Sequence, residues 1–591
     1  MTGVVINDLS ILIGGDAGQG VESGGAGFSQ AFARAGLHVF AMQDFRSRIR
    51  GGHNFYQIRL SERPVYSHSD PVHLVIALTP ESVALHQDNI ADGGAVIFPD
   101  KFEIDEAPLR RRGISVDALP LLSIAQEHGD RVMVNTAALA AAAGITGFPL
   151  EFLEGVIRQN FARKGAAAVE ANLRVAAAAC KVARERYGSD FPYRLRAVDG
   201  APQRLLMNGN QALAMGALAG GCRFISAYPM TPATTIMEWL AALPPEYGVV
   251  AKHAEDEIAA VCMAIGASFA GARAMTATSG GGFSLMVEAM GLAGMTEVPV
   301  VIVNAQRGGP STGLPTHTEQ SDLLFAVHAS QGEFPRIVLA PGTVQECFET
   351  GWRALNLAER YQCPVVVMTD TLLASSIQTV DADAIDFAAV EIDRGATLDH
   401  ADLEGQPGDV YRRFEFTETG VSPRALPGHP RGVYAVASDE HDETGHISED
   451  SANRVAMMQK RMRKLDEAEK ELRPPALYGP PRAETTLVCW GSTYGACREA
   501  VDRINQAGGS ANVLQFADLW PLPREEAARA LEACRETVAV EQNYTSQLAL
   551  LLRMVTGVQV DRTLNKYDGR PFGPEEIAAA LGREVVSGHK V

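Results

Sequence analysis

Tyr228-Pro229-Met230-Thr231-Pro232 is the stretch from which the fold is most readily worked out, because it follows a predicted strand at 223–227. Loops at strand ends are where open α/β sheets bind ligands. The two prolines restrict the backbone around Thr231, so its hydroxyl and nearby N–H groups are held in place before any ligand binds. Fixed donors suit a carboxylate or carbonyl ligand. The other interpretation is a proline-rich turn in which Thr231, Thr234 or Thr235 caps the next helix.

Glu257 begins a second informative segment. The apolar run 258–266 predicts a buried helix, 272–278 predicts a strand, and Ser279-Gly280-Gly281-Gly282-Phe283 predicts a turn that starts another helix. A glutamate in the first turn of a helix is commonly solvated and complements the helix dipole. The order of the elements here, a glutamate, an apolar helix, a strand and a glycine turn, favours instead a carboxyl group in a dry pocket, where it can share or donate a proton.

This order of elements resembles the pyrimidine-binding domain of thiamine-diphosphate enzymes. The Tyr-Pro-x-Thr-Pro loop narrows the resemblance to the alpha subunit of the 2-oxoacid:ferredoxin oxidoreductases. The resemblance implies that Glu257 is catalytic, its carboxyl hydrogen-bonding the aminopyrimidine ring that removes the thiazolium C2 proton. It also implies the remaining site residues, with Ser279, Gly280 and Gly281 binding the cofactor and Tyr228, Pro229 and Thr231 binding a 2-oxo acid.

A polar, glycine-rich segment, Arg307 to Asp322, follows the predicted strand 298–304. Its Arg-Gly-Gly-Pro-Ser-Thr-Gly-Leu-Pro-Thr run is similar to the active-site wall of the same family, in which many members carry Arg or Lys at the position of His317. The resemblance therefore makes His317 a candidate for binding the substrate carboxylate. A histidine does this only when protonated or as a neutral donor. Arg307 is the alternative, because it is always charged and can bind a carboxylate through two parallel hydrogen bonds.

Composition excludes several classes of protein. A chain of 591 residues holds about three or four domains. The formal net charge of −19 argues against nucleic acid or anionic membrane as a partner, since both are bound by basic surfaces. The apolar stretches are shorter than the roughly 20 residues of a membrane span. The N-terminus lacks the basic and apolar regions of a signal peptide. We expect a cytoplasmic protein.

Residues 1–190 begin with a strand at 9–13, a glycine loop at 14–21 and a helix, which together predict a βαβ unit. The loop is a weak dinucleotide fingerprint, since Ala17 replaces the middle glycine, and either a tight turn or NAD binding fits it. Arg-Gly-Gly after Gly-Gln-Gly resembles the gamma domain of the same family. The resemblance suggests that coenzyme A docks here, on Gly18, Gln19, Gly20, Arg46, Arg48, Arg50 and His53. Alternatively, these arginines pair with the abundant carboxylates.

The predicted fold class is α/β, with several doubly wound domains. A gamma domain at 1–190 precedes a pyrimidine-binding thiamine-enzyme domain at 198–375 and an acidic connecting segment at 376–484, in which Ser451 caps a charged helix running to about Leu472. Residues 485–591 resemble the transketolase C-terminal domain. We expect no catalytic residue from that last domain, although 566–572 could line an interface.

The sequence lacks several parts that this chemistry requires. It contains no Gly-Asp-Gly motif for Mg²⁺ and diphosphate, and its eight cysteines include no Cys-x-x-Cys pair. His441 and His446 are five residues apart, unlike the histidines of a His-Glu-x-x-His helix, so we predict no metal site here. The resemblance therefore implies a separate beta subunit that holds Mg²⁺ and a [4Fe–4S] cluster, within an (alpha-beta)2 assembly that reduces ferredoxin.

The reaction implied by the resemblance joins a 2-oxo acid, coenzyme A and oxidised ferredoxin to give acyl-CoA, CO2 and reduced ferredoxin, or runs in reverse as reductive carboxylation. The fused gamma and alpha arrangement favours 2-oxoglutarate. Pyruvate, indolepyruvate and branched 2-oxo acids stay open as substrates. So do two other classes, a non-redox thiamine-dependent decarboxylase and a NAD-binding protein that uses the 14–20 loop.

Overall fold

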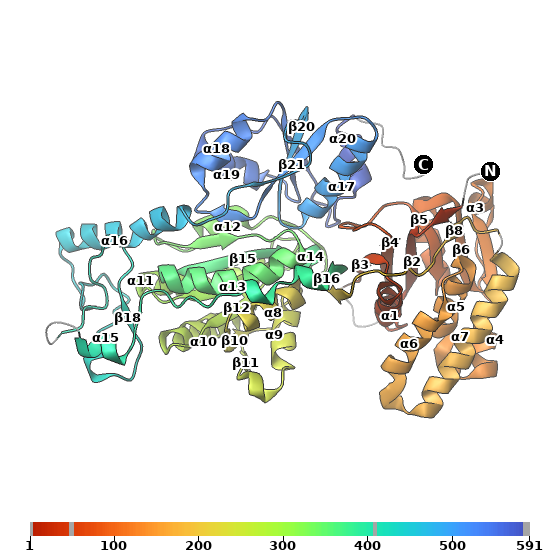
Figure 1. The fold of residues 1–591 in the computed structure, drawn as a ribbon, viewed down its shortest axis with the longest axis horizontal. Coiled ribbons are helices and arrows are strands. Elements are labelled where there is room, and N and C mark those ends of the chain that lie inside the picture. The colour runs from red at the N-terminus through yellow and green to blue at the C-terminus, as the bar shows by residue number, and fades with distance from the viewer. Residues whose placement is uncertain (1–3, 47–51, 189, 406–409, 583–591) are drawn as a thin grey trace. The chain divides into compact units, whose positions relative to one another are not determined.

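The computed structural model describes residues 4–46, 52–188, 190–405 and 410–582. They form two compact units, each assembled from separate stretches of the chain. The first unit contains the described residues up to Met207, together with 375–384 and those from Gly573 onward, and the second contains 208–374 and 385–572. Figure 1 labels the elements of both units. Within the second unit we call 208–374 the middle domain and 476–572 the last domain.

The first unit is built on an eight-stranded sheet in the order β7-β6-β5-β2-β4-β3-β16-β9. Pairings on the β5 side of β2 are parallel, whereas those on the β4 side are antiparallel. The predicted α/β class is confirmed, but this sheet is mixed, because the chain returns beside β2 through β4 after the arginine-rich segment. The strands are β2 (Asp8–Asp16), β3 (His38–Asp44), β4 (His53–Ser61), β5 (Val72–Ala77), β6 (Ile90–Pro99), β7 (Ser115–Leu119), β9 (Arg204–Met207) and β16 (Ile377–Asp381).

Two alanine-rich helices of the first unit, α5 (Val134–Thr146) and α7 (Ala166–Tyr187), pack at backbone distance. A Cβ atom at Gly144 would overlap the carbonyl of Cys180, so only glycine permits this approach. This contact fixes the closest approach of the two helices. The other helices are α1 (Val21–Arg34), α2 (Pro80–His86), α3 (Ala107–Arg111), α4 (Leu121–His128), α6 (Leu150–Phe161) and α20 (Pro574–Ala580), and β1 (Val5–Ile6) pairs with β8 (Tyr193–Arg194).

The middle domain is built on a seven-stranded sheet in the order β11-β10-β12-β13-β15-β14-β22. Its pairings are parallel except for β14 with β22, a strand that the last domain contributes. Interior strands such as β13 (Val300–Gln306) and β15 (Pro364–Asp370) are buried on both faces and begin as continuous apolar runs, the pattern expected in a parallel sheet. The other strands are β10 (Phe224–Ala227), β11 (Val250–His253), β12 (Ala274–Thr278), β14 (Ile337–Leu339) and β22 (Asp518–Trp520), and β11 is largely exposed.

Helices cover both faces of this sheet. The first, α8 (Gly209–Ala219), starts with a capping box between Asn208 and Gln211, whose side chains each accept from the other's backbone N–H. It packs closely on α13 (Val344–Tyr361), because a Cβ atom at Gly216 would overlap the carbonyl of Phe348. The other helices are α9 (Thr234–Ala241), α10 (Glu257–Phe269), α11 (Gly280–Met295), α12 (Leu323–His328) and α14 (Thr371–Ser375).

The last domain has a five-stranded sheet in the order β19-β21-β20-β23-β24. It shares one hydrophobic core with the middle domain, since Phe283 and Met290 of α11 lie in the same buried cluster as Trp490 and Leu548. The two domains therefore form one packed body. The elements are β19 (Ala476–Tyr478), β20 (Thr485–Trp490), β21 (Ala511–Phe516), β23 (Thr537–Glu541), β24 (Arg562–Asn565), α17 (Thr493–Gln506), α18 (Arg524–Glu532) and α19 (Gln547–Thr556).

The segment between these domains has little regular structure until α16 (Ser451–Glu469). The predicted cap of that helix is wrong by one residue. Asp450 caps it, because its carboxylate accepts a 2.8 Å hydrogen bond from Asn453 N, and Ser451 is the first helical residue. Before α16 the segment contains β17 (Thr397–Leu398), α15 (His400–Gly405) and β18 (Arg424–Ala425).

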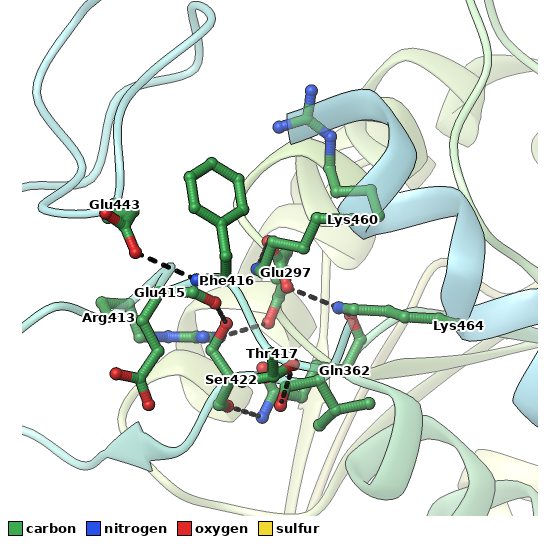
Figure 2. Close-up of polar contacts among 12 residues, drawn as sticks. Glu297, Gln362, Arg413, Glu415, Phe416, Thr417, Ser422, Glu443, Lys460 and Lys464 are labelled. Atoms are coloured by element: carbon green, nitrogen blue, oxygen red, sulfur yellow. Dashed lines mark hydrogen bonds and ion pairs between the residues drawn. The ribbon is translucent and has the colours of Figure 1, made fainter. Parts of the chain in front are cut away.

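Glu297 joins this segment to the middle domain through a buried ionic cluster (Figure 2). Its Oε1 lies 2.6 Å from Nζ of Lys460 and its Oε2 lies 2.5 Å from Nζ of Lys464, while Arg413 donates to its carbonyl oxygen. Burial raises the pKa of Glu297, but the two lysines outweigh burial and hold that pKa well below its usual range. Burial lowers the pKa of Lys460 to about 7. Three basic side chains thus surround one carboxylate.

Candidate active site

Three polar segments that the sequence singled out follow neighbouring parallel strands. Tyr228–Pro232 follows β10, Ser279 follows β12 and Arg307 follows β13, and these strands are adjacent in the order β10-β12-β13. Because the carboxyl ends of parallel strands meet at one edge of the sheet, the three segments gather there. This edge is our candidate active site.

Glu257 is the first residue of α10 and is only 4% exposed. Its neighbour Asp256 caps the helix by accepting a 2.7 Å hydrogen bond from Ala259 N, which leaves Glu257 without a capping role. Oε1 of Glu257 is buried and has no hydrogen-bond partner among the described residues. An unpaired buried carboxylate oxygen costs roughly 1–3 kcal/mol or more. A hydrogen-bond donor from a ligand would satisfy this oxygen, which the described residues leave unpaired.

The glycine turn at the start of α11 makes room for that carboxyl group. A Cβ atom at Gly282 would lie 2.7 Å from both Cγ and Oε1 of Glu257 and would overlap Oγ1 of Thr278. At Gly281 a Cβ atom would meet open space. Sequence reasoning named Gly280 and Gly281 and missed Gly282, the glycine in contact with Glu257. Ser279 is fully buried and its hydroxyl also lacks a partner among the described residues.

The Tyr228–Pro232 loop is held from two sides. Arg307 Nη1 donates a 2.8 Å hydrogen bond to the carbonyl of Thr231. On the other side, Asn210 Nδ2 donates to the carbonyl of Pro232 at 2.8 Å. The structure therefore brings together two predicted substrate residues, Thr231 and Arg307, and adds Asn210, which only its place in the Asn-Gly-Asn helix start could have indicated. Tyr228 is 39% exposed, so its ring is available to a ligand.

The segment after Arg307 forms a tight turn that carries His317. Leu314 N donates to the Gly308 carbonyl at 2.8 Å, and Gly308 N donates to the His317 carbonyl at 3.1 Å. Gly313 has a φ of +51° and faces Gly308 so closely that a side chain would not fit. His317 is half-buried and lies against Gly569 of the last domain, where a Cβ atom would come within 2.9 Å of the His317 Cβ.

Asp322 is a further site residue that the sequence analysis did not single out. Its Oδ2 would lie 2.5 Å from a Cβ atom at Gly280, so the carboxylate sits at the N-terminus of α11. Asn304 Nδ2 donates to the same oxygen at 3.1 Å, and Gln306 Oε1 accepts from Asp322 N at 3.0 Å. Burial raises the pKa of Asp322, against the opposing effect of Asn304. In the sequence, Asp322 could have been found from its position at the end of the polar segment that starts at Arg307.

The first unit contains a cavity of about 1270 Å³ at the carboxyl ends of β2, β5 and β6. Gly18, Gln19 and Gly20 line it, together with the basic residues Lys101, Arg131 and Lys164. Gly18 and Gly20 have φ values of +90° and +74°, which only glycine adopts readily. The glycine loop is therefore part of a hollow of ligand size.

Two other candidates for coenzyme A, Arg46 and His53, are not among the described residues that line this cavity. His53 is buried, and its Nε2 lies 2.8 Å from Nε2 of His86, so one ring donates to the other. Burial lowers the pKa of His53. Arg46 donates from its backbone to Asn54 Oδ1. Arg48 and Arg50 lie outside the described residues.

The described part of the chain contains neither a candidate membrane span nor a candidate metal cluster. None of its helices is long and apolar enough to cross a membrane. Within the same residues, no group of three or more His, Cys, Asp or Glu side chains is placed to hold a metal ion. Glu440, beside His441, instead pairs with Arg454 and Arg461.

Three family comparisons match successive parts of the chain. Residues 10–182 match pyruvate ferredoxin/flavodoxin oxidoreductase, and 215–461 match the thiamine diphosphate-binding part of pyruvate flavodoxin/ferredoxin oxidoreductase. Residues 483–577 match core domain II of pyruvate:ferredoxin oxidoreductase. The order of these matches follows the predicted order of domains.

Similar proteins span nearly the full chain. The alpha subunit of 2-oxoacid:ferredoxin oxidoreductase from a Sulfolobus species is 33% identical over 98% of both chains. The 2-oxoglutarate oxidoreductase subunit KorA of Mycobacterium tuberculosis is 30% identical over 98% of this chain and 92% of its own. A solved structure of 2-oxoglutarate:ferredoxin oxidoreductase from Magnetococcus marinus, with 2-oxoglutarate, coenzyme A and succinyl-CoA bound, is 34% identical with a TM-score of 0.91, covering 98% of this chain and 99% of that one.

Proposed function

Because this chain belongs to the 2-oxoacid:ferredoxin oxidoreductases, as an alpha subunit with a fused gamma-like domain, we propose that its enzyme acts on 2-oxoglutarate. The reaction is the coenzyme A-dependent oxidative decarboxylation of 2-oxoglutarate to succinyl-CoA and CO2 with electrons passed to ferredoxin, and its reverse. Two relatives support this substrate, the Magnetococcus marinus enzyme and the Mycobacterium tuberculosis subunit, whose names specify 2-oxoglutarate. Reduced, unpaired cysteines fit the cytoplasmic setting we propose.

The buried, unpaired Oε1 of Glu257 is the observation that carries the proposal. Bound thiamine diphosphate supplies the carbon nucleophile for this chemistry. Glu257 would hold a hydrogen bond to the aminopyrimidine ring and move a proton at Oε1. The residues present fit this group, because Gly282 leaves room beside the carboxylate and the unpaired hydroxyl of Ser279 begins the same turn. Ser279, Gly280 and Gly281 would line the ring.

The 2-oxo acid would lie against the Tyr228–Pro232 loop. The Thr231 hydroxyl and backbone, Tyr228 and Pro229 would orient its reacting end. A dicarboxylate such as 2-oxoglutarate needs two positive or donating groups, and Arg307 and His317 stand on the same polar segment. Burial lowers the pKa of Arg307, yet a guanidinium stays charged at neutral pH, so Arg307 can bind a carboxylate while it also holds Thr231.

A beta subunit would complete the site with Mg²⁺, the diphosphate-binding domain and the [4Fe–4S] cluster. The surface beside Glu257 suits a protein partner, because α10 and α11 expose the apolar side chains of Ile258, Met263 and Leu285. Exposed apolar groups of this size beside a functional site favour association with another protein. An assembly of two alpha and two beta chains, with ferredoxin as electron acceptor, is the arrangement we propose.

Coenzyme A would bind in the first unit. We assign its nucleotide end to the cavity of about 1270 Å³, with the glycine loop and the basic residues Lys101, Arg131 and Lys164 facing phosphate groups. Backbone N–H groups at the start of α1 favour such anions. Arg46, Arg48, Arg50 and His53 stay a prediction from the sequence.

One assay tests the proposal as a whole. The chain is produced together with its beta subunit, and reduction of a viologen dye is followed with 2-oxoglutarate and coenzyme A. We expect dye reduction that requires both substrates, and a higher kcat/KM for 2-oxoglutarate than for pyruvate, indolepyruvate or a branched 2-oxo acid. Preference for another 2-oxo acid would replace 2-oxoglutarate as the substrate. A purified complex that lacks iron and decarboxylates without coenzyme A would be a non-redox decarboxylase and would overturn the proposal.

A further inference from the structure

Gln320 is fully buried, and both its backbone and its side chain form hydrogen bonds with the last domain. Its N–H donates to the carbonyl of Gln542 at 2.7 Å, and its Oε1 accepts from Gln542 N at 3.2 Å. Its carbonyl accepts from Asn543 Nδ2 at 3.0 Å, and its own Nε2 donates to the carbonyl of Trp490 at 2.9 Å. Four hydrogen bonds therefore fix this one residue of the active-site segment to another domain. We call residues 316–322 the wall segment.

Glu541 orients the side-chain amide of Asn543, which donates to the carbonyl of Gln320. Its Oε2 accepts from Asn543 Nδ2 at 2.9 Å and from Trp490 Nε1 at 3.3 Å, and its carboxylate also accepts from the backbone of Leu548 and Ala549 in α19. A carboxylate at the N-terminus of a helix is well stabilised there. Asn543 therefore has its donor group set in one orientation.

A second contact follows directly along the chain. Gln547, the first residue of α19, donates from Nε2 to the carbonyl of Ser321 at 2.7 Å and accepts at Oε1 from Leu324 N at 2.9 Å. This places α19 beside α12, within the one core that the middle and last domains share (Figure 1). The end of the wall segment is thus held as firmly as its middle.

The wall segment carries two groups of the candidate active site. Asp322, at its end, places its carboxylate against Gly280 at the start of α11. His317, near its start, lies against Gly569. We call Gln542 and Asn543 the clamp. The turn that contains Gly569 is also bonded to the clamp, because Gln542 Nε2 donates to the carbonyl of Arg570 at 3.2 Å. Gln542 therefore contacts both the wall segment and the surface behind His317.

We propose that Gln542 and Asn543 are positioning residues for the proposed reaction, which set the place of the wall segment and so of His317 and Asp322. The last domain then contributes to the active site rather than only to packing. Hydrogen bonds between neutral amides suit this role. Each adds only about 0.5–1.5 kcal/mol of net stability, but its geometry fixes the orientation of the two groups that it joins. The expected effect on catalysis rests on the proposed function, whereas the expected effect on the position of the wall segment rests on these contacts alone.

The test compares two variants of the clamp with a matched control. Asn543→Leu removes the donor to Gln320, and Gln542→Met removes the donor to Arg570 while keeping similar bulk. Asn512→Leu serves as the control, because Asn512 is a buried amide of the same domain that donates to Pro480, far along the chain from the wall segment. All three are made in the assembled alpha-beta complex, with kcat and KM measured for 2-oxoglutarate.

We expect both clamp variants to lose roughly 10- to 100-fold in kcat/KM relative to Asn512→Leu at matched thermal stability, because small displacements of site residues are costly. Hydrogen–deuterium exchange should rise in 316–322 and at the start of α11 in these variants only. Equal kcat/KM and equal exchange in clamp and control variants would overturn the proposal. Where Asn543→Leu fails to assemble, Asn543→Ser gives the same comparison. Hydrogen–deuterium exchange also separates this proposal from the proposed function. If the wild-type complex turns over no 2-oxo acid, the proposed function fails. The exchange measurement still decides whether Gln542 and Asn543 hold the wall segment in place.

Discussion

Glu257 and Gly282 are in contact so close that a side chain at position 282 would displace the carboxyl group: a Cβ atom there would lie 2.7 Å from Oε1 of Glu257. Glu257 is the first residue of α10 and Gly282 lies in the first turn of α11, and the strand β12 separates the two helices. The catalytic proposal depends on this contact, because only a residue without a side chain leaves room here for the buried carboxyl group of Glu257.

Gly282→Ala should therefore greatly lower activity, because the added Cβ atom would overlap Oγ1 of Thr278 and press against Glu257. The added methyl group forces Glu257 away, and we expect a loss of about 100-fold or more in kcat, as for other small displacements of catalytic groups. Viologen reduction by the assembled complex measures it. Gly155→Ala in α6 is the control, since its Cβ atom would make only an ordinary contact with Arg34. Equal activity in both variants would contradict the assignment of Glu257.

Glu257→Gln should separate stability from catalysis. Oε1 has no partner among the described residues, so removing its charge leaves no other group unpaired. We expect a melting temperature equal to or above that of wild type, and loss of C2-proton exchange in bound thiamine diphosphate, followed by NMR in deuterated water. A general acid–base group contributes about 10²- to 10⁴-fold. Exchange at the wild-type rate would reject the role given to Glu257.

Arg307 and His317 should determine preference for a dicarboxylate. Arg307→Met and His317→Leu each remove a donor, and a hydrogen bond to a charged group is worth about 1.5–3 kcal/mol. We expect kcat/KM for 2-oxoglutarate to fall by roughly 10- to 100-fold, and the ratio of 2-oxoglutarate to pyruvate to fall in at least one variant. Arg307→Lys keeps the charge and should retain more activity. If the ratio of kcat/KM for 2-oxoglutarate to that for pyruvate is unchanged in both variants, other residues bind the distal carboxylate of 2-oxoglutarate.

Glu297→Gln should be among the most destabilising substitutions in the chain. The variant leaves Lys460, Lys464 and Arg413 buried together with no carboxylate, and removing one partner of a buried ion pair costs about 3–5 kcal/mol. Lys460→Met should cost far less, because Lys464 still pairs with Glu297 at 2.5 Å. Thermal denaturation of the two variants side by side gives the comparison. Equal melting temperatures would show that the carboxylate is not what holds the cluster.

Stability should also depend on pH through Lys460. Burial lowers its pKa to about 7 in the folded chain, from 10.5 in the unfolded chain. Between these pH values the unfolded chain binds a proton that the folded chain does not, so stability rises with pH across that window. Lys460→Met should remove this part of the rise. For Glu297, whose folded pKa is lowered, the stability it provides is present above its ordinary pKa of 4.5 and is lost as pH falls below it.

Coenzyme A affinity should depend on the cavity of the first unit. Lys101→Ala and Arg131→Ala are each expected to weaken binding by roughly 10- to 100-fold, the range that corresponds to a hydrogen bond to a charged group. Titration calorimetry of the assembled complex measures the Kd. Lys181→Ala is the control, because Lys181 is an exposed residue of α7. Weakening by Arg46→Ala alone would direct attention back to the arginine-rich segment.

Sequence patterns located the centre of the middle domain well. Continuous apolar strands, the proline-flanked loop at Thr231 and the polar start of α10 are all local signals, and each element lies where its pattern placed it. Gly282 was harder to predict, because a run of three glycines does not show which one faces a partner. That information depends on the angle at which α11 meets α10.

Contacts between distant segments could not be read from the sequence. Gln320 and Asn543 are unremarkable polar residues in isolation, and their hydrogen bond joins positions that only tertiary packing brings together. The expectation that the last domain has no catalytic residue remains compatible with the structure, since Gln542 and Asn543 act through the wall segment. Similarly, β4 was not predicted, because polar residues interrupt its apolar pattern.

The strand β16 has a practical consequence for anyone dividing this protein into parts. It pairs with β3 on one side and β9 on the other, although it comes from a stretch that follows the whole middle domain. A fragment ending at residue 190 would lack both strands, leaving the backbone groups of β3 open to pair with another copy. Such a fragment should be prone to aggregate, and a soluble version would need residues 375–384 supplied through an engineered linker.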